Sequence, residues 1–273
     1  MHVSYLIRGG TRVLWTVDRT FSDPQPWTFQ LEVGRTGAAS SDDWIAVGDP
    51  VVDTCYAVDT VQRNYNVGMQ DTHYRVRLTT SQGTYYSLPT AKEGVLPSRD
   101  WRLARRILRG ERVRAKYTAA EGFLLKRRTT GQDCTLCLDP QTNAVTDVYC
   151  PVCRGTGKVC GYYQPMPCVW ADLAPMQQQR QMDDQATAGT VRTSVTTARM
   201  SMFPIVEEQD VWVNRLTDDR YFITAIGVVA AMRGVPLIAN VGMRLAPFTD
   251  VVYDMAIPEQ LRSAEPTTWG AYY

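Results

Sequence analysis

This sequence carries Cys134-Thr-Leu-Cys137 and, with twelve residues between, Cys150-Pro-Val-Cys153-Arg-Gly-Thr-Gly157. Two cysteines separated by two residues can bind one side of a tetrahedral metal ion, and two such pairs complete a shell of four sulfurs. Glycines after the second pair let the backbone turn through conformations that side chains disfavour. The spacing therefore predicts a structural zinc site at Cys134, Cys137, Cys150 and Cys153. A closed shell of four sulfurs leaves no coordination position for a substrate, which argues against a catalytic metal.

Two disulfide bonds, or a cluster of free thiols, are the rival interpretations of these four cysteines. The chain has 7 cysteines, an odd number, and residues 1–8 lack the basic-then-apolar layout of a signal peptide. We therefore expect a reducing compartment, in which metal ligation is favoured over disulfides. Iron also accepts four thiolates, so the sequence leaves zinc and iron as alternatives.

Three further cysteines, Cys55, Cys160 and Cys168, lie outside the two pairs. Free cysteine behaves as a small hydrophobic residue, so we expect each of them to be buried. Cys160 is close enough in sequence to be a rival ligand. The roles of Cys160 and Cys168 are not determined by the sequence.

The composition is that of an ordinary globular protein. The chain has 273 residues, 44% of them hydrophobic and 21% charged, with a formal net charge of +1. This length corresponds to two domains or one large one. The longest apolar stretch lies within residues 222–232 and is too short to span a bilayer, so no membrane partner is expected.

The N-terminal part of the chain has the pattern of β-strands. Apolar and polar residues alternate in short segments separated by turn residues, and residues 74–87 are typical of a hairpin with its turn at 81–83. We predict that residues 1–95 form an immunoglobulin or fibronectin type III-like β-sandwich. Tyr74 is either a tyrosine-corner residue of such a sandwich or an ordinary core tyrosine. The alternating segments are residues 12–17, 27–33 and 73–78.

A basic helical linker is predicted over residues 96–130. Between Arg99 and Arg128 there are eleven basic residues and three acidic ones. Residues 102–109 have high helical propensity and place Leu103 and Ile107 on one face, whereas Gly110 weakens a continuation of the helix. The linker is either a solvated helix or a surface that binds an acidic partner. The candidate partner-binding residues are Arg102, Arg105, Arg106 and Arg109.

The chain beyond the linker is predicted to form a zinc-binding segment at 131–165 and a β-domain at 166–262. Gly234 is the expected turn of a hairpin between residues 226–231 and 237–245. We predict a small β-barrel or sandwich, with an exposed polar arm near residues 177–187 and an unstructured or partner-bound tail at 263–273. The other expected strands are residues 191–197, 210–214 and 219–225.

No catalytic constellation can be assembled from these residues. The two histidines, His2 and His73, have no nucleophile motif beside them. The paired aspartates lie in turn-like contexts that explain them without acid–base chemistry. We therefore expect a protein that is not an enzyme.

Several motifs resemble those of structural proteins of tailed bacteriophages, most closely fibronectin-type and zinc-bearing proteins of the neck or head-to-tail connector. The cysteine cluster is the specific part of this likeness, and the other motifs are loose. The Cys-x-x-Cys-x-Gly-x-Gly form is also similar to half of the zinc region of J-domain cochaperones, but the chain has two cysteine pairs where that family has four. The motifs of the phage likeness are residues 18–24, 27–35, 71–78, 99–106, 219–225, 233–238 and 244–247.

The phage resemblance implies a component of the virion, assembled in the host bacterial cytoplasm and placed between portal and tail. Its implied partners are other copies of itself in a ring and the neighbouring portal, connector and tail proteins. The alternative is a nucleic-acid-binding protein that uses the zinc knuckle and the stripe 99–128. The aromatic residues of that stripe are too widely spaced for a stacking platform, so a protein partner is favoured over nucleic acid.

Overall fold

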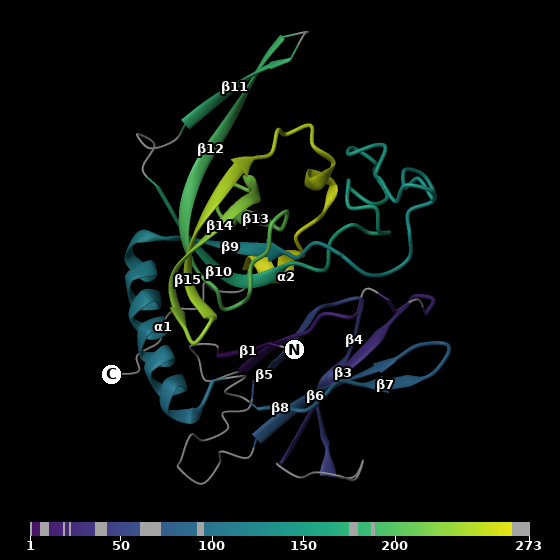
Figure 1. The fold of residues 1–273 in the computed structure, drawn as a ribbon, viewed down its shortest axis with the longest axis vertical. Helices are drawn as coiled ribbons and strands as arrows, with labels where there is room; N and C mark the ends of the chain where they lie inside the picture. The colour runs from purple at the N-terminus through teal and green to yellow at the C-terminus, as the bar shows by residue number, and fades with distance from the viewer. Residues whose placement is uncertain are drawn as a thin grey trace. The chain divides into compact units, whose positions relative to one another are not determined.

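The computed structural model describes a mainly β protein (Figure 1). The chain divides into two compact units, each built from two separate parts: Met1–Ser98 with Arg128–Gln164, and Arg99–Arg127 with Pro165–Tyr273. The cysteine pairs belong to the first unit and the basic helix to the second. No described helix is long and apolar enough to cross a membrane. The described residues are 2–5, 11–18, 20–21, 23–35, 43–60, 72–91, 96–174, 180–186 and 189–263.

The described strands of the first unit form two antiparallel sheets. One has the order β1-β2-β5, and the other has the order β4-β3-β6-β7 with β8 also paired to β6. The turn at residues 81–83 joins β6 to β7, which confirms the predicted hairpin. The strands are β1 (His2–Tyr5), β2 (Thr11–Leu14), β3 (Thr28–Arg35), β4 (Ile45–Val52), β5 (Tyr56–Asp59), β6 (Thr72–Thr79), β7 (Thr84–Tyr86) and β8 (Thr90–Ala91).

A single apolar core joins the two sheets of the first unit. Val13 of the first sheet packs in the same cluster as alternate residues of β3 and β6, such as Leu31 and Val76, which face each other in register. The alternation in the sequence therefore marks the side of these strands that enters the apolar core, although Gln30 and Glu32 on the other side of β3 are buried too. The buried members of the core are Val13, Trp15, Trp27, Phe29, Leu31, Val33, Tyr74, Val76 and Leu78.

Tyr74 is part of this core and is also tied to the neighbouring sheet. Its hydroxyl donates a buried hydrogen bond of 2.9 Å to Oδ2 of Asp59. The bond links the beginning of β6 to the end of β5. A tyrosine corner uses a backbone acceptor, so this bond to a carboxylate is a different contact at a similar place.

Six of the described strands in the second unit close into an antiparallel barrel. They run in the order β9, β13, β14, β15, β12 and β10, and the barrel closes because β10 pairs with both β9 and β12. Of the two predicted forms, barrel and sandwich, the barrel is confirmed. The strands are β9 (Ala120–Leu125), β10 (Met166–Leu173), β12 (Gly189–Ser201), β13 (Val211–Asn214), β14 (Arg220–Met232) and β15 (Val235–Leu245).

Strand β9 corrects the predicted helical linker. It lies within residues 96–130 and contributes one wall of the barrel, pairing with β10 and β13. Its residues from Gly122 to Leu125 are buried. This short apolar run follows a long basic segment, and its partners in the barrel lie more than forty residues away in sequence, so the local pattern did not reveal it.

Two hairpins extend the barrel. Strand β11 (Arg180–Ala186) pairs with the first half of β12, so residues 180–186 of the polar arm predicted at 177–187 form a strand, and its other residues lie outside the described ones. Strands β14 and β15 form the second hairpin, which confirms the turn predicted at Gly234. Arg233 and Gly234 both have positive φ, at 48° and 82°, as a type I′ turn requires.

The basic segment forms one helix, α1 (Ser98–Thr118), which continues through Gly110 instead of ending there. Its buried residues, Trp101, Ala104, Leu108, Glu111 and Ala115, recur at intervals of three and four. The prediction that Leu103 helps to form the apolar face is wrong, since 50% of Leu103 is exposed. The buried face combines Trp101 and Leu108 with two alanines and Glu111, and the acidic residue is the member that an apolar pattern does not include.

Glu111 anchors α1 to the strands of the barrel. Although burial opposes its charge, hydrogen bonds from Arg199 and Arg114 outweigh that effect and hold the pKa of Glu111 below its ordinary value. Arg199 of β12 donates to both carboxylate oxygens at 2.9 Å. Arg114 bridges Glu111 to Asp172 of β10. One helical carboxylate is thus linked to two adjacent strands.

The last described part of the chain is fixed by Arg220 at the beginning of β14. Its guanidinium donates to the carbonyl of Val252, within the short 3-10 helix η3 (Val251–Asp254), and to that of Met255, directly after it. A short helix α2 (Glu259–Ser263) follows. The predicted tail, from residue 264 onward, lies outside the described residues.

Candidate metal centre

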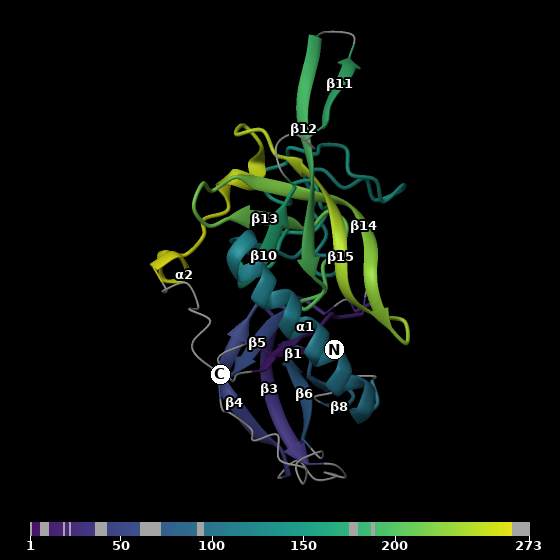
Figure 2. The same ribbon diagram turned by 90° about the vertical axis from the view of Figure 1, so that its left-hand side faces the viewer.

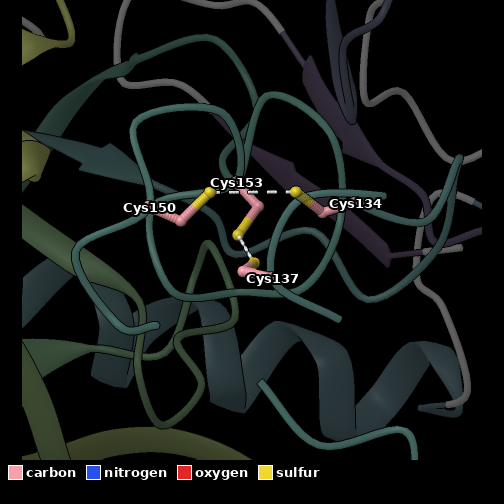
Figure 3. Close-up of side chains that lie close together, drawn as sticks. All are labelled: Cys134, Cys137, Cys150 and Cys153. Atoms are coloured by element: carbon pink, nitrogen blue, oxygen red, sulfur yellow. Dashed lines mark hydrogen bonds between the residues drawn. The ribbon is translucent and has the colours of Figure 1, made fainter. Parts of the chain in front are cut away.

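The four cysteine side chains of the two pairs point toward one another (Figure 3). Their sulfurs all lie within 4.8 Å of one another, and all four residues are buried. The Sγ atoms of Cys134 and Cys150 are 3.8 Å apart, and those of Cys137 and Cys153 are 3.0 Å apart. The four cysteines predicted as ligands are therefore close together in the structure. They could hold a metal ion.

The donor set fits a tetrahedral ion. Four sulfurs at about 2.3 Å from a central zinc ion would lie about 3.8 Å from one another. The separation of 3.8 Å between Cys134 and Cys150 equals this value, and the separation of 3.0 Å between Cys137 and Cys153 would have to widen by about 0.8 Å. The described cysteines are free thiols, so the rival prediction of two disulfides is wrong.

Hydrogen bonds to backbone carbonyls hold the second cysteine of each pair. The carbonyl of Cys137 accepts from the backbone N–H of Thr146 at 2.8 Å and from its hydroxyl at 2.9 Å. The carbonyl of Cys153 accepts in the same way from Thr156, at 3.0 Å and 2.7 Å. The sequence reasoning missed both threonines. Thr156 follows Cys153 closely enough for a local Ser/Thr turn to indicate it, whereas no local signal marks Thr146.

Glycines after the second pair are required by the path of the chain. Gly155 and Gly157 have φ values of 73° and 78°, in the left-handed region that favours glycine. A Cβ atom on Gly155 would lie 2.7 Å from the carbonyl oxygen of Val148. The role predicted for these glycines, turning the backbone round the cysteines, is therefore confirmed.

The electrostatics of the cluster favour a cation. The backbone N–H of Cys153 lowers the pKa of the Cys150 thiol to about 7, against the opposing effect of burial. Burial raises the pKa of Cys137 above its ordinary value, and the neighbouring sulfurs raise it further. The Cys150 thiol therefore loses its proton more readily than an ordinary cysteine, whereas burial and the neighbouring sulfurs disfavour a negative charge on Cys137. A bound dication would stabilise the thiolate form of both residues.

Two short segments form a stem at the base of the loop that carries the four cysteines, which we call the metal loop. Arg128 donates its backbone N–H to Gly161 at 2.9 Å, and the N–H of Val159 donates to Gln132 at 2.9 Å. The Arg128 side chain is buried, with its guanidinium over the ring of Tyr163 at 4.6 Å. Arg128 also approaches Asp53, at 3.6 Å between Nη1 and Oδ1. The stem is thereby joined to the β-sheets of the same unit.

The remaining cysteines behave differently from one another. Cys55 is buried, as predicted, whereas Cys160 is exposed, which corrects its predicted burial. Cys160 is outside the four-sulfur cluster. Its φ of 68° belongs to a tight turn, in which its N–H donates to Val152, and such turns lie at the surface. The side chain of Cys168 lies outside the described residues.

Only part of the predicted basic stripe, residues 99–128, is exposed at the surface. The candidate residues Arg102, Arg105, Arg106 and Arg109 are all exposed on α1. Lys126 and Arg128, at the other end of the stripe, are buried. The stripe is therefore one helical face and not a continuous track of charge.

Lys126 belongs to a buried ionic cluster that the sequence reasoning missed. Its Nζ donates to Asp210 at 2.8 Å and to Glu207 at 2.7 Å. Asp210 is 0% exposed and also accepts from the backbone N–H groups of Arg127 and Glu207. Burial opposes the charge of Lys126, but its attraction to Asp210 and Glu207 outweighs burial and raises the pKa of Lys126. The cluster fixes the chain where it leaves β9.

Comparison with known proteins adds no relative to this description. No protein-family model matches the chain, and no curated protein sequence matches it either.

Proposed function

We propose that this protein is a non-enzymatic structural component of a tailed-phage virion, which assembles as a homo-oligomeric ring in the neck or head-to-tail connector. The observation that carries the proposal is the closed cluster of four buried cysteine sulfurs. A shell of four thiolates offers strong binding and no open position, which suits a structural role. The sequence resemblance supplies the virion context.

We further propose that the ion is zinc and that the first unit is fibronectin type III-like. Zinc is the usual occupant of a closed shell of four thiolates at this spacing. A sheet of strands 1, 2 and 5 that shares its core with a sheet ordered 4-3-6-7 supports a Greek-key sandwich of this kind. Metal analysis of the purified chain should find about one zinc per chain, and iron in its place would overturn the assignment.

The assembly proposal is tested with a matched pair of cysteine variants. Cys150→Ser should reduce incorporation into particles and abolish rings in negative-stain images, because it removes one buried ligand. Cys160→Ser changes an exposed cysteine outside the cluster and should assemble as the wild type does. Normal rings from a Cys150→Ser protein without bound metal would contradict the proposal.

A second candidate is nucleic-acid binding, favoured by the four exposed arginines of α1. The burial of Lys126 and Arg128 leaves a short basic face, so we propose a protein partner for α1 in preference to nucleic acid. In a gel-shift titration at two salt concentrations, we expect no micromolar complex with DNA at the lower one. Tight binding that falls steeply with salt and is lost in an Arg102→Glu, Arg106→Glu double variant would reverse this preference.

A further inference from the structure

The barrel has an exposed strand edge along β14. Strand β13 pairs with β14 only from Arg220 to Phe222, and Ile223 makes the last backbone bonds on that side. From residue 224 to residue 232, no described strand pairs with this edge of β14. The opposite edge of β14 pairs with β15. The side chains there are open to solvent: Val228 is 53% exposed and Val229 is 48% exposed.

This edge lacks the features that normally keep strand edges apart. Residues 224–232 read Thr-Ala-Ile-Gly-Val-Val-Ala-Ala-Met, without a charge and without proline. Exposed edges in proteins are usually blocked by charged side chains, by proline or by a covering element. The strand does contain register shifts, which twist it locally, but its composition is that of a segment which takes up another strand.

The ribbon formed by β11 and the first half of β12 also has a strand edge that no other described strand pairs with. Among the described strands, β11 pairs only with β12, through the register Arg180↔Val195 to Ala186↔Gly189. The pairing of β12 with β15 begins at Val195, so residues 189–194 of β12 are not paired with β15. A two-stranded ribbon is marginally stable in water and gains from a third strand.

The two free edges lie toward opposite ends of the barrel. The ribbon leaves at the end of β15, where Val195 faces Arg244. The free part of β14 instead pairs with the beginning of β15, from Met232↔Val235 to Ala225↔Gly242. Figure 2 shows the ribbon and the β14–β15 turn pointing away from each other. One copy therefore cannot satisfy its own edge with its own ribbon.

We propose that β11 of one copy adds as a strand to the residue 224–232 edge of β14 in the next copy. The contact joins two different surfaces, so repetition generates a ring or, without closure, a filament. Residues 180–186 contain two aspartates and one arginine, and they meet no like charge on the uncharged β14 edge. This interface rests on the proposed ring assembly and specifies where the copies meet.

The interface is tested by disabling each side separately. Val228→Lys and Val229→Lys place a charge on the acceptor edge at exposed positions, so the barrel should remain folded. Replacing residues 177–194 by a short glycine-rich turn removes the donor ribbon and leaves the pairing of β10 with β12, Leu173↔Ala198, in place. Leu216→Lys is the control, since Leu216 is 91% exposed on the same barrel but lies in the turn after β13.

Sedimentation measures the size of the assemblies that the wild type and each variant form. Wild type and Leu216→Lys should form multi-subunit assemblies, and each interface variant should fall to the mass of its own single chain, which is 30.7 kDa for the wild type. An equimolar mixture of Val228→Lys with the ribbon-deleted protein should form dimers and nothing larger, because only one donor–acceptor pair remains. Circular dichroism establishes that each variant is folded.

Different outcomes overturn different statements. If the wild type forms rings and the interface variants do so as well, the β14 contact is wrong while the ring proposal stands. If the ribbon-deleted protein dimerises alone, the edge pairs with itself and the head-to-tail contact is wrong. If the wild type stays a single chain at every concentration, the ring proposal fails, and the β14 contact fails with it.

Discussion

Cys153→Ser is expected to abolish metal binding and to unfold the loop that carries the four cysteines. Cys153 is 0% exposed, and its sulfur is one of the four that converge on the centre. Structural zinc contributes an apparent free energy of about 10–16 kcal/mol in small domains, and Cys153→Ser removes one of the four ligands on which this contribution depends. The loop has little apolar core of its own: Val145 is the partly buried hydrophobic residue packed against the cluster.

Amide hydrogen exchange and elemental analysis of the same sample measure this effect. The variant should contain no stoichiometric metal, and residues 131–164 should exchange as an unfolded chain while the barrel strands stay protected. Cys160→Ser should match the wild type in both measurements, since this residue is exposed and outside the cluster. A Cys153→Ser protein that keeps both its metal and its protection would show that another group is the ligand.

Asp210→Ala is expected to lower the free energy of unfolding of the barrel by about 3–5 kcal/mol, because it breaks a buried ion pair. The substitution leaves Lys126 buried without its closest buried anion, and it also leaves the backbone N–H groups of Arg127 and Glu207 without their carboxylate acceptor. Equilibrium unfolding in urea, with unchanged m-values, would give the difference directly.

Glu207→Ala is the matched control for this cluster. Glu207 also binds Lys126, at 2.7 Å, but 57% of its side chain is exposed. Exposed ion pairs contribute about 1 kcal/mol or less, so the control should lose far less stability than Asp210→Ala. If the two variants lost equal free energy of unfolding, burial of Asp210 would not be the reason that its ion pair stabilises the barrel.

Local patterns explain which features could be predicted from the sequence. The spacing of the cysteine pairs is a chemical requirement within a short segment, and the predicted ligands are the residues that converge. The same holds for the alternation along β6 and for the turn at Arg233 and Gly234, whose positive φ values need no distant partner.

Features that depend on distant partners could not be predicted in this way. Arg128 looks like one more solvated charge in a basic run, and only the fold places it over Tyr163. Residues 180–186 have the composition of a loop, yet they form β11 because β12 lies beside them. The buried face of α1 includes Glu111, whose carboxylate is stabilised by Arg199 on a strand far along the chain.

The position of the metal loop in the sequence has a consequence for the kinetics of folding. The loop connects β9 to β10, which are adjacent strands of the barrel, so their pairing must close a long connection. The entropic cost of closure grows with the length of flexible chain between the strands. A metal ion that orders the loop beforehand shortens that flexible length and brings the two strands near each other. If the four cysteines hold the proposed zinc, we expect the barrel to close faster when the ion is supplied during synthesis than when it is withheld.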